Sequence, residues 1–198
     1  TGVVSGIVAG VIPVTYTLGS GCRAVNEVTV ITLPAVVGGP SQVCVNDSIV
    51  MTHPTAGGTW NSSNAARATI DPLTGMIHGI SAGTAVITYS VSTGCFNVRT
   101  ITVNALPTPI TGPLQVCEGS TITLASTPTP GGIWVSDTTA AATVGYLSGV
   151  VTGIAAGHTN ISYILGATGC LTRVQVTVNV TPPTITGNPH ICFGSSNT

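Results

Sequence analysis

The feature that most constrains the fold is a ten-residue motif that occurs three times in the chain. It reads IVAGVIPVTY at 7–16, ISAGTAVITY at 80–89 and IAAGHTNISY at 154–163. The spacing of the copies is nearly constant, and the two tryptophans, Trp60 and Trp134, recur at the same interval as the last two copies. Repetition at a fixed period indicates one structural unit used several times. The unit has about 74 residues, the size of a small β-sandwich.

The motif itself alternates as a half-buried strand does. In AVITYSV (85–91), Val86, Thr88 and Ser90 turn one way, while the more apolar residues between them, ending with Tyr89 and Val91, turn toward a core. Val, Ile and Thr are abundant, and Gly and Pro interrupt the chain every few residues, so helix is not expected. Each unit contains seven short segments bounded by turn residues, a pattern typical of an immunoglobulin-like sandwich.

The sequence therefore predicts an all-β chain of tandem Ig-like sandwiches arranged end to end. In the second complete unit we expect strands near 109–111, 114–117, 121–126, 133–136, 142–145, 149–153, 159–165 and 172–178. In the first we expect matching strands at 48–53, 59–62, 84–91 and 97–103. Proline-rich joints divide the chain into 1–33 (the last three strands of a repeat), 34–106 and 107–181 (complete repeats) and 182–198 (the start of another). We expect the chain to be a window on a longer repetitive protein.

Charge excludes several classes of function. Only 5% of residues are charged and the net charge is −1, which offers nothing to nucleic acid or to an anionic membrane. The opening segment 1–21 carries no charge. It is broken by Gly and Pro and alternates rather than runs apolar, so we expect no membrane insertion.

A family resemblance follows from GGTWNSSNAARATIDPLTGMIHGISAGTAVITYSV (57–91). This stretch resembles bacterial group 2 Ig-like (BIG2-like) domains, although the second unit departs from the pattern at WVSDTTAAATV (134–144). With its VC and TGC motifs, the chain is similar to the tandem arrays of very large secreted bacterial surface proteins. The resemblance implies an extracellular, cell-surface protein in which the repeats serve as a stalk, filament shaft or adhesin. Its expected partners are neighbouring copies of the repeat, with a glycan or another cell-surface ligand as the alternative.

Six cysteines recur at two repeat positions, which favours disulfides in an exported chain. They are Cys22, Cys95 and Cys170, each after a glycine, and Cys44, Cys117 and Cys192, each after Val or Ile. One arrangement pairs them within repeats, as Cys44–Cys95 and Cys117–Cys170. In an Ig-like unit, however, these positions lie at opposite ends, roughly 25 Å apart at about 3.3 Å per residue, whereas a disulfide needs Cα atoms within about 7 Å. A second arrangement joins consecutive repeats through Cys44–Cys170, and a third pairs Cys22–Cys44, Cys95–Cys117 and Cys170–Cys192.

Other candidate sites have plainer interpretations. The tryptophans, with Tyr16, Tyr89 and Tyr163, recur once per unit and are expected in the core. The four histidines, His53, His78, His158 and His190, fall at unrelated repeat positions, so we expect no metal site, no catalytic residues, no cofactor and no enzyme activity. Asp-Ser-Ile at 47–49 and Asp-Thr-Thr at 137–139 match a bacterial O-glycosylation motif, which makes Ser48 and Thr138 candidate modification sites. An accessory domain of an enzyme remains a further alternative, because the rest of the chain is unseen.

Overall fold

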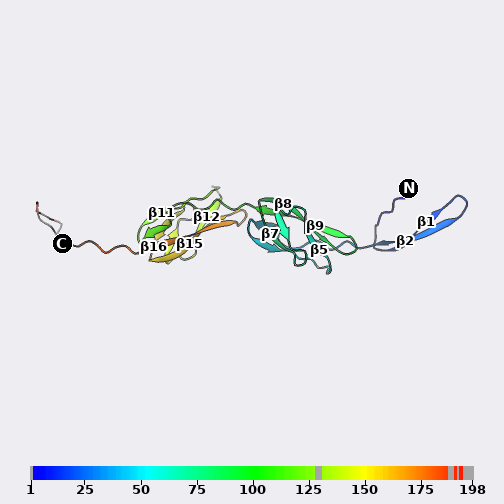
Figure 1. Cartoon of the computed structure of the whole chain (residues 1–198), viewed down its shortest axis with the longest axis horizontal. Coiled ribbons are helices and arrows are strands. Elements are labelled where there is room, and N and C mark those ends of the chain that lie inside the picture. The colour runs from blue at the N-terminus through cyan, green and yellow to red at the C-terminus, as the bar shows by residue number, and fades with distance from the viewer. Residues whose placement is uncertain (1, 128–130, 187–189, 191, 194–198) are drawn as a thin grey trace. The chain divides into compact units, whose positions relative to one another are not determined.

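The computed structural model describes residues 2–127, 131–186, 190 and 192–193 (Figure 1). Every regular element in these residues is a β-strand, as the composition predicts. The chain divides into two compact units, Thr1–Ala105 and Leu106–Thr198. Each unit contains one complete sandwich, called here the first and the second repeat.

The first repeat is a sandwich of two antiparallel-rich sheets. One sheet has the order β3-β9-β8-β5 and the other the order β4-β7-β6. Their strands are β3 (Gln42–Cys44), β4 (Ser48–Val50), β5 (Thr59–Ser62), β6 (Ala68–Ile70), β7 (Met76–Gly79), β8 (Gly83–Ser90) and β9 (Phe96–Asn104). Only β3 pairs in parallel, with the end of β9. This is the strand order of an immunoglobulin-like sandwich.

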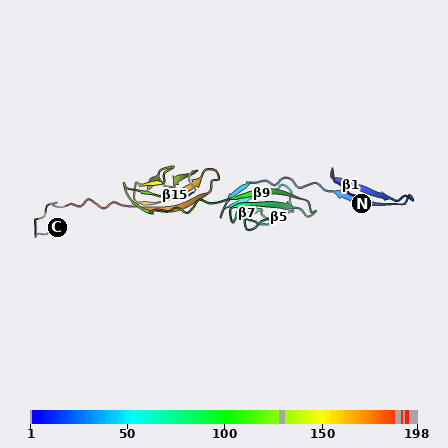
Figure 2. The same ribbon diagram turned by 90° about the horizontal axis from the view of Figure 1, so that it is seen from above.

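The second repeat has the same topology, strand for strand. Its sheets are β10-β16-β15-β12 and β11-β14-β13, and Figure 2 shows the strands of each repeat from above. The strands are β10 (Gln115–Cys117), β11 (Thr121–Thr123), β12 (Gly132–Ser136), β13 (Ala142–Val144), β14 (Val150–Gly153), β15 (Gly157–Leu165) and β16 (Leu171–Asn179). The repetition in the sequence therefore corresponds to repetition of the fold.

A tryptophan and a tyrosine on neighbouring strands form the centre of each core. Trp60 is paired with Tyr89 in the β5–β8 register, and Trp134 with Tyr163 in the β12–β15 register. The ring centroids are 4.7 Å apart in the first pair and 4.8 Å in the second. All four side chains are buried, as their repeat positions predict. The alternation in β8 also holds, with Ala85, Ile87 and Tyr89 buried and their neighbours facing outward.

Two remaining strands form a separate hairpin, in which β1 (Gly10–Thr17) pairs with β2 (Arg23–Val30). They match β8 and β9 in sequence but pair with no other described strand. The prediction that Tyr16 is a core residue is wrong for this structure, because Tyr16 is 69% exposed. Its burial depends on a second sheet, and no described strand supplies that layer to the hairpin.

Near the ends of each sandwich, some predicted strands are absent or shorter than predicted. No strand forms at 109–111, where only an isolated bridge joins Thr111 to Ala125. The strands predicted at 48–53 and 121–126 end early, at Val50 and Thr123. From there the chain bends to pair with the proline-rich segment through isolated bridges, Gly38 to Thr52 in the first repeat. Few residues from 181 onward are described and none is in a strand, so the prediction that 182–198 opens another repeat lies largely outside the described residues.

Candidate functional site: cysteines at the two ends of each repeat

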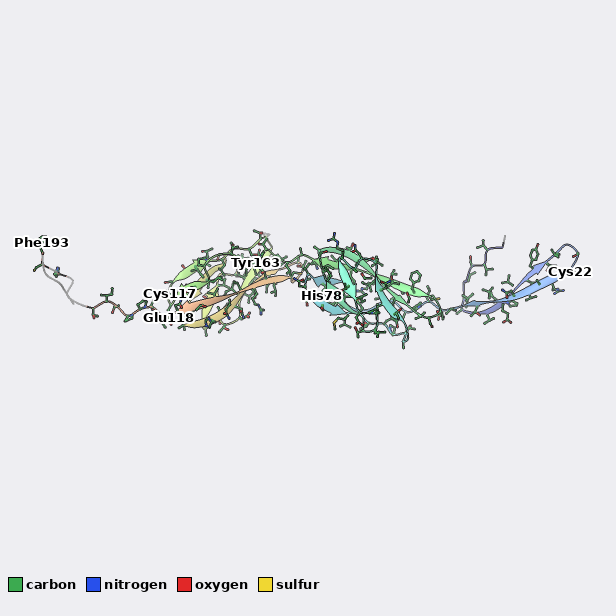
Figure 3. The ribbon with its side chains drawn as sticks, viewed as in Figure 1. Cys22, His78, Cys117, Glu118, Tyr163 and Phe193 are labelled. Atoms are coloured by element: carbon green, nitrogen blue, oxygen red, sulfur yellow. The ribbon has the colours of Figure 1, made fainter. Side chains whose placement is uncertain are left out.

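Cys44 and Cys117 occupy one end of their sandwiches. Cys44 is the last residue of β3 and is paired with Asn104, the last residue of β9. Cys117 ends β10 and is paired in the same way with Asn179. Figure 3 shows Cys117 at the end of the second repeat, apart from Tyr163 in its interior.

The other cysteines close the turns that join the two longest strands. In the β8–β9 turn the amide of Val91 donates to the carbonyl of Cys95 at 3.0 Å. In the β15–β16 turn the amide of Leu165 donates to the carbonyl of Cys170 at 2.8 Å. Cys22 closes the hairpin turn in the same manner and lies at its tip in Figure 3. The glycine before each of these cysteines has a φ of 74° to 88°, a conformation that glycine adopts without strain and that explains the repeated Gly-Cys motif.

The register places the two cysteines of one repeat far apart. Nine residues of the chain separate Cys95 from Asn104, the partner of Cys44, which corresponds to roughly 30 Å of strand at about 3.3 Å per residue. The same count separates Cys170 from Asn179, the partner of Cys117. The within-repeat disulfides are therefore ruled out by geometry.

The chemical states of the cysteines agree with this geometry. Cys44 and Cys170 are both disulfide-bonded, whereas Cys22, Cys95 and Cys117 are thiols. Neither Cys44–Cys95 nor Cys117–Cys170 is formed, so that prediction is corrected. The third arrangement (Cys22–Cys44, Cys95–Cys117 and Cys170–Cys192) is not formed either, because Cys22 and Cys95 are thiols.

Trp60 and Tyr89 do not form an open sugar-binding surface. A hollow of about 280 Å³ in the first repeat is bordered by Trp60, Tyr89 and His53, among others. The His53 ring stacks on Tyr89 at 4.0 Å, and Trp60 lies edge-on to His53 at 6.2 Å. Trp60 and Tyr89 are 7% and 5% exposed, so neither leaves a ring face for a ligand. Their contacts are those of core packing.

His78 and His158 each contact a hydroxyl on a neighbouring strand of their own sheet, whereas His53 Nε2 contacts the carbonyl of Ala35. His78 Nδ1 is 3.0 Å from Ser48 Oγ, and His158 Nδ1 is 3.1 Å from Thr177 Oγ1. Both are cross-strand pairs of exposed residues. The Ser48–His78 contact was not predicted, because the β4–β7 register creates it between residues 30 positions apart. Within the described residues no three His, Cys, Asp or Glu side chains gather to hold a metal ion.

The two candidate modification sites are both exposed. Ser48 begins β4, and its amide donates to Asp47 Oδ1 at 2.7 Å. Thr138 follows β12 in a turn, where its amide donates to Thr159 Oγ1 at 3.0 Å. Glycosylation at these hydroxyls remains a prediction.

The described part of the chain contains no helix with the length and hydrophobicity that a membrane crossing requires.

Comparison with known proteins identifies no family for the chain. No protein-family model matches the sequence, and no curated protein sequence matches it. A C-terminal 282-residue fragment of intimin, solved with the intimin-binding domain of its receptor, is 16% identical with a TM-score of 0.46. The match covers 75% of this chain and 66% of that one.

Two further solved structures are similarly distant. Invasin, a bacterial integrin-binding protein, is 16% identical with a TM-score of 0.45, over 87% of this chain and 46% of invasin. Domains 4 and 5 of the S-layer protein SbsC are 18% identical with a TM-score of 0.36, over 76% of this chain and 100% of that one. The chain thus spans less than two thirds of the intimin and invasin chains. The strand order itself defines the class: an all-β protein of Ig-like sandwiches.

Proposed function

We propose that this chain is a segment of a long extracellular bacterial surface protein, in which Ig-like repeats are stiffened by disulfides and act as a stalk or filament shaft. The disulfide we propose is Cys44–Cys170, which joins consecutive repeats. The proposal assigns no catalytic role to the segment; His78 and His158 each contact one hydroxyl on a neighbouring strand, and they lie in different repeats.

The observation that carries the proposal is the state of the cysteines. Cys44 and Cys170 are disulfide-bonded while Cys95 and Cys117 are thiols. Since the strand register prevents a bond within a repeat, the bonded pair has to involve different repeats. By repeat equivalence, Cys95 and Cys117 are the matching positions for the preceding and following repeats of a longer array.

The mechanical consequence follows from the number of connections. Two sandwiches joined by one peptide segment bend at that segment. A disulfide adds a second covalent connection and removes much of this freedom. The proposed bond also closes a loop of over 100 residues, for which loop-closure entropy predicts a stabilisation of about 4–5 kcal/mol against unfolding. Stiffness and resistance to unfolding are properties that a shaft requires.

Peptide mapping of the unreduced 198-residue chain tests this proposal. Thiols are first blocked with iodoacetamide, the chain is digested, and the fragments are analysed by mass spectrometry. We expect a linked fragment that contains Cys44 and Cys170, and carbamidomethyl groups on Cys95 and Cys117. Linked fragments that join Cys44 to Cys95 would overturn it.

Electron microscopy of the unreduced native material then tests the shaft. Ordered filaments with an axial repeat of roughly 35–45 Å per unit are expected from about ten residues of strand plus turns. Cys44→Ser removes the proposed cross-repeat disulfide and is expected to give flexible strings of beads. Flexible strings from the unaltered protein would count against a shaft.

A further inference from the structure

The outer surface of one sheet in the first repeat carries no charge. Along β5, β8 and β9 the side chains that point away from the core are uncharged, and we call them the uncharged face. They are Thr59, Asn61, Thr84, Val86, Thr88, Ser90, Phe96, Val98, Thr100 and Thr102. Arg99, the only Lys, Arg, Asp or Glu in these three strands, turns to the other side, where its Nη1 donates to the carbonyl of Val37 at 2.9 Å.

Three large apolar residues form a stripe across this face. Val86, Val98 and Phe96 are 36%, 48% and 56% exposed. Val86 is paired with Thr100 and Val98 with Thr88, so the two valines are diagonal neighbours within reach of each other. Phe96, two residues before Val98, extends the stripe to the end of β9.

The second repeat has charge at the corresponding place. Its β15–β16 turn runs from Leu165 to Cys170, one residue longer than the turn from Val91 to Cys95 in the first repeat. The extra residue shifts β16 by one position, so Arg173 points outward from the position opposite Ser162.

Arg173 is held there by polar neighbours. Its Nη1 lies 3.9 Å from Asp137 Oδ2, and its Nε donates to Ser162 Oγ at 3.3 Å. Ser162 in β15 matches Thr88 in β8, so Arg173 stands where Val98 stands in the first repeat. One residue of turn length therefore separates a charged face from an uncharged one.

We infer that the uncharged face of the first repeat is a docking surface for the same face of a second copy. Burying this face removes no ion from water, so it avoids the desolvation penalty of a charged interface. A charged partner would leave its charge unpaired against threonine and valine, which disfavours it. A face that meets itself about a two-fold axis needs no complementary charge, and two sheets stack in this way about 10 Å apart.

The size of the face sets the strength of the contact. Two strands of about eight residues and the four-residue β5, spaced about 4.8 Å apart, cover roughly 320 Å² per copy. The total is below the roughly 1,200 Å² of a stable specific interface. A single pair of faces therefore associates weakly and reversibly, and many copies along parallel chains multiply the effect. This inference deepens the proposed shaft by naming a lateral contact, and it rests on that proposal for its role.

Sedimentation equilibrium over about 10 μM to about 1 mM tests the contact. The unreduced, iodoacetamide-blocked full chain is used, so that free thiols cannot cross-link copies. We expect reversible dimers for the unaltered chain. Val98→Arg places on this face the residue that the second repeat already carries, and we expect it to weaken association at least tenfold.

Two variants provide matched controls. Val50→Arg introduces the same charge at a 50% exposed valine on the other sheet, and Arg173→Val removes the charge from the second repeat. Neither is expected to weaken dimerisation. Unchanged circular dichroism, and unchanged Trp60 fluorescence in the Trp134→Phe background, show that Val98→Arg is folded. Thr100→Glu is a second test of the same face.

Three results would overturn the inference: a monomer at all concentrations, equal association by Val98→Arg and the unaltered chain, or loss of association in Val50→Arg. Val98→Arg leaves every cysteine in place. The disulfide map therefore tests the proposed shaft, and the dimerisation constant tests the docking face, so either proposal can be overturned without the other.

Discussion

The two repeats share a fold but differ in the side chains that bind the segment before the first strand, which we call the leading segment. It is 34–37 in the first repeat and begins near Thr108 in the second. In the first repeat, three side chains hold the carbonyls of the segment 34–37. His53 Nε2 is 2.6 Å from the Ala35 carbonyl, Arg99 Nη1 donates to Val37 at 2.9 Å, and Asn97 Nδ2 donates to Pro34 at 3.4 Å. The His53 ring also stacks on Tyr89, which connects the segment to the core.

In the second repeat hydroxyl groups take over this role. Ser126 Oγ donates to the Thr108 carbonyl at 2.7 Å, and Thr108 corresponds to Ala35 in the repeat. The amide of Thr127 donates to Thr108 Oγ1 at 2.7 Å. The contact is conserved in position while an imidazole is replaced by a hydroxyl.

The difference teaches which parts of the unit are fixed by the fold. The backbone needs a donor at the end of the second strand, and either residue type supplies it. The Trp–Tyr pair and the glycines around it allow no such exchange, because space there is limited. Adding a Cβ to Gly58 or Gly132 would bring it into the ring of Tyr89 or Tyr163.

The largest expected effect is a loss of unfolding free energy that should be similar in the two repeats. Gly75 and Gly149 have φ of 71° and 69°, and a Cβ at either would meet the tryptophan ring and the carbonyl of Met51 or Leu124. Gly75→Ala and Gly149→Ala should each destabilise their repeat by about 2–4 kcal/mol, from left-handed strain and overpacking.

Urea unfolding measures each repeat separately, because each contains one tryptophan. The Trp134→Phe background reports the first repeat and Trp60→Phe the second. Gly57→Ala is the control for strain alone, since Gly57 has a φ of 79° but nothing near its Cβ position. A large loss in one repeat and none in the other would show that the cores are not equivalent.

A smaller loss of stability is expected when the side chains that bind the leading segments are removed, and its size should differ between the repeats. His53→Ala removes a hydrogen bond and an aromatic contact, and should cost about 1–3 kcal/mol. Ser126→Ala removes one hydrogen bond and should cost about 0.5–1.5 kcal/mol. The same two backgrounds report the losses. Equal losses would mean that the stacking on Tyr89 contributes nothing.

The central strands were predictable from sequence because their signals are local. Alternation fixes the inward and outward faces of β8, and the recurring Trp and Tyr mark the core. The isolated bridges of the leading segments could not be predicted from the sequence. They form with residues such as Thr52, which lies beyond the end of its strand where the chain has bent. Tyr16 shows that a repeat position predicts burial only where the rest of the unit is present to cover it.

The candidate site was predictable in kind but not in detail. Six cysteines allow 15 pairings. The predicted sandwich already puts Cys44 and Cys95 at opposite ends of a repeat, and the strand register confirms that separation. The constant spacing of the sequence repeat equates Arg99 with Arg173, yet the longer turn makes Val98 the residue equivalent to Arg173. A shift of one residue moves each side chain of a strand to the opposite face of the sheet. No local sequence pattern predicts this shift.

The smallest expected effect is a difference between the repeats in acid. Asp71 Oδ1 accepts hydrogen bonds from the Thr74 amide at 2.7 Å, the Thr74 hydroxyl at 2.9 Å and the Leu73 amide at 3.0 Å. These bonds, that from the Thr74 amide first, hold the pKa of Asp71 below its ordinary value of 3.8. In the second repeat Gly145 occupies this position, since Gly149 donates to its carbonyl as Gly75 does to that of Asp71.

Because the folded pKa of Asp71 is the lower one, its contribution is present above the unfolded pKa and is lost as the pH falls toward the folded value. The first repeat should therefore lose stability as the pH falls from about 4.5 toward about 2, and Asp71→Asn should flatten this dependence while keeping an acceptor oxygen for the turn. Urea midpoints measured across this range in the Trp134→Phe background give the comparison, with the second repeat in the Trp60→Phe background as the control. An identical acid slope with and without Asp71 would show that the stability of the turn does not depend on the charge of this carboxylate.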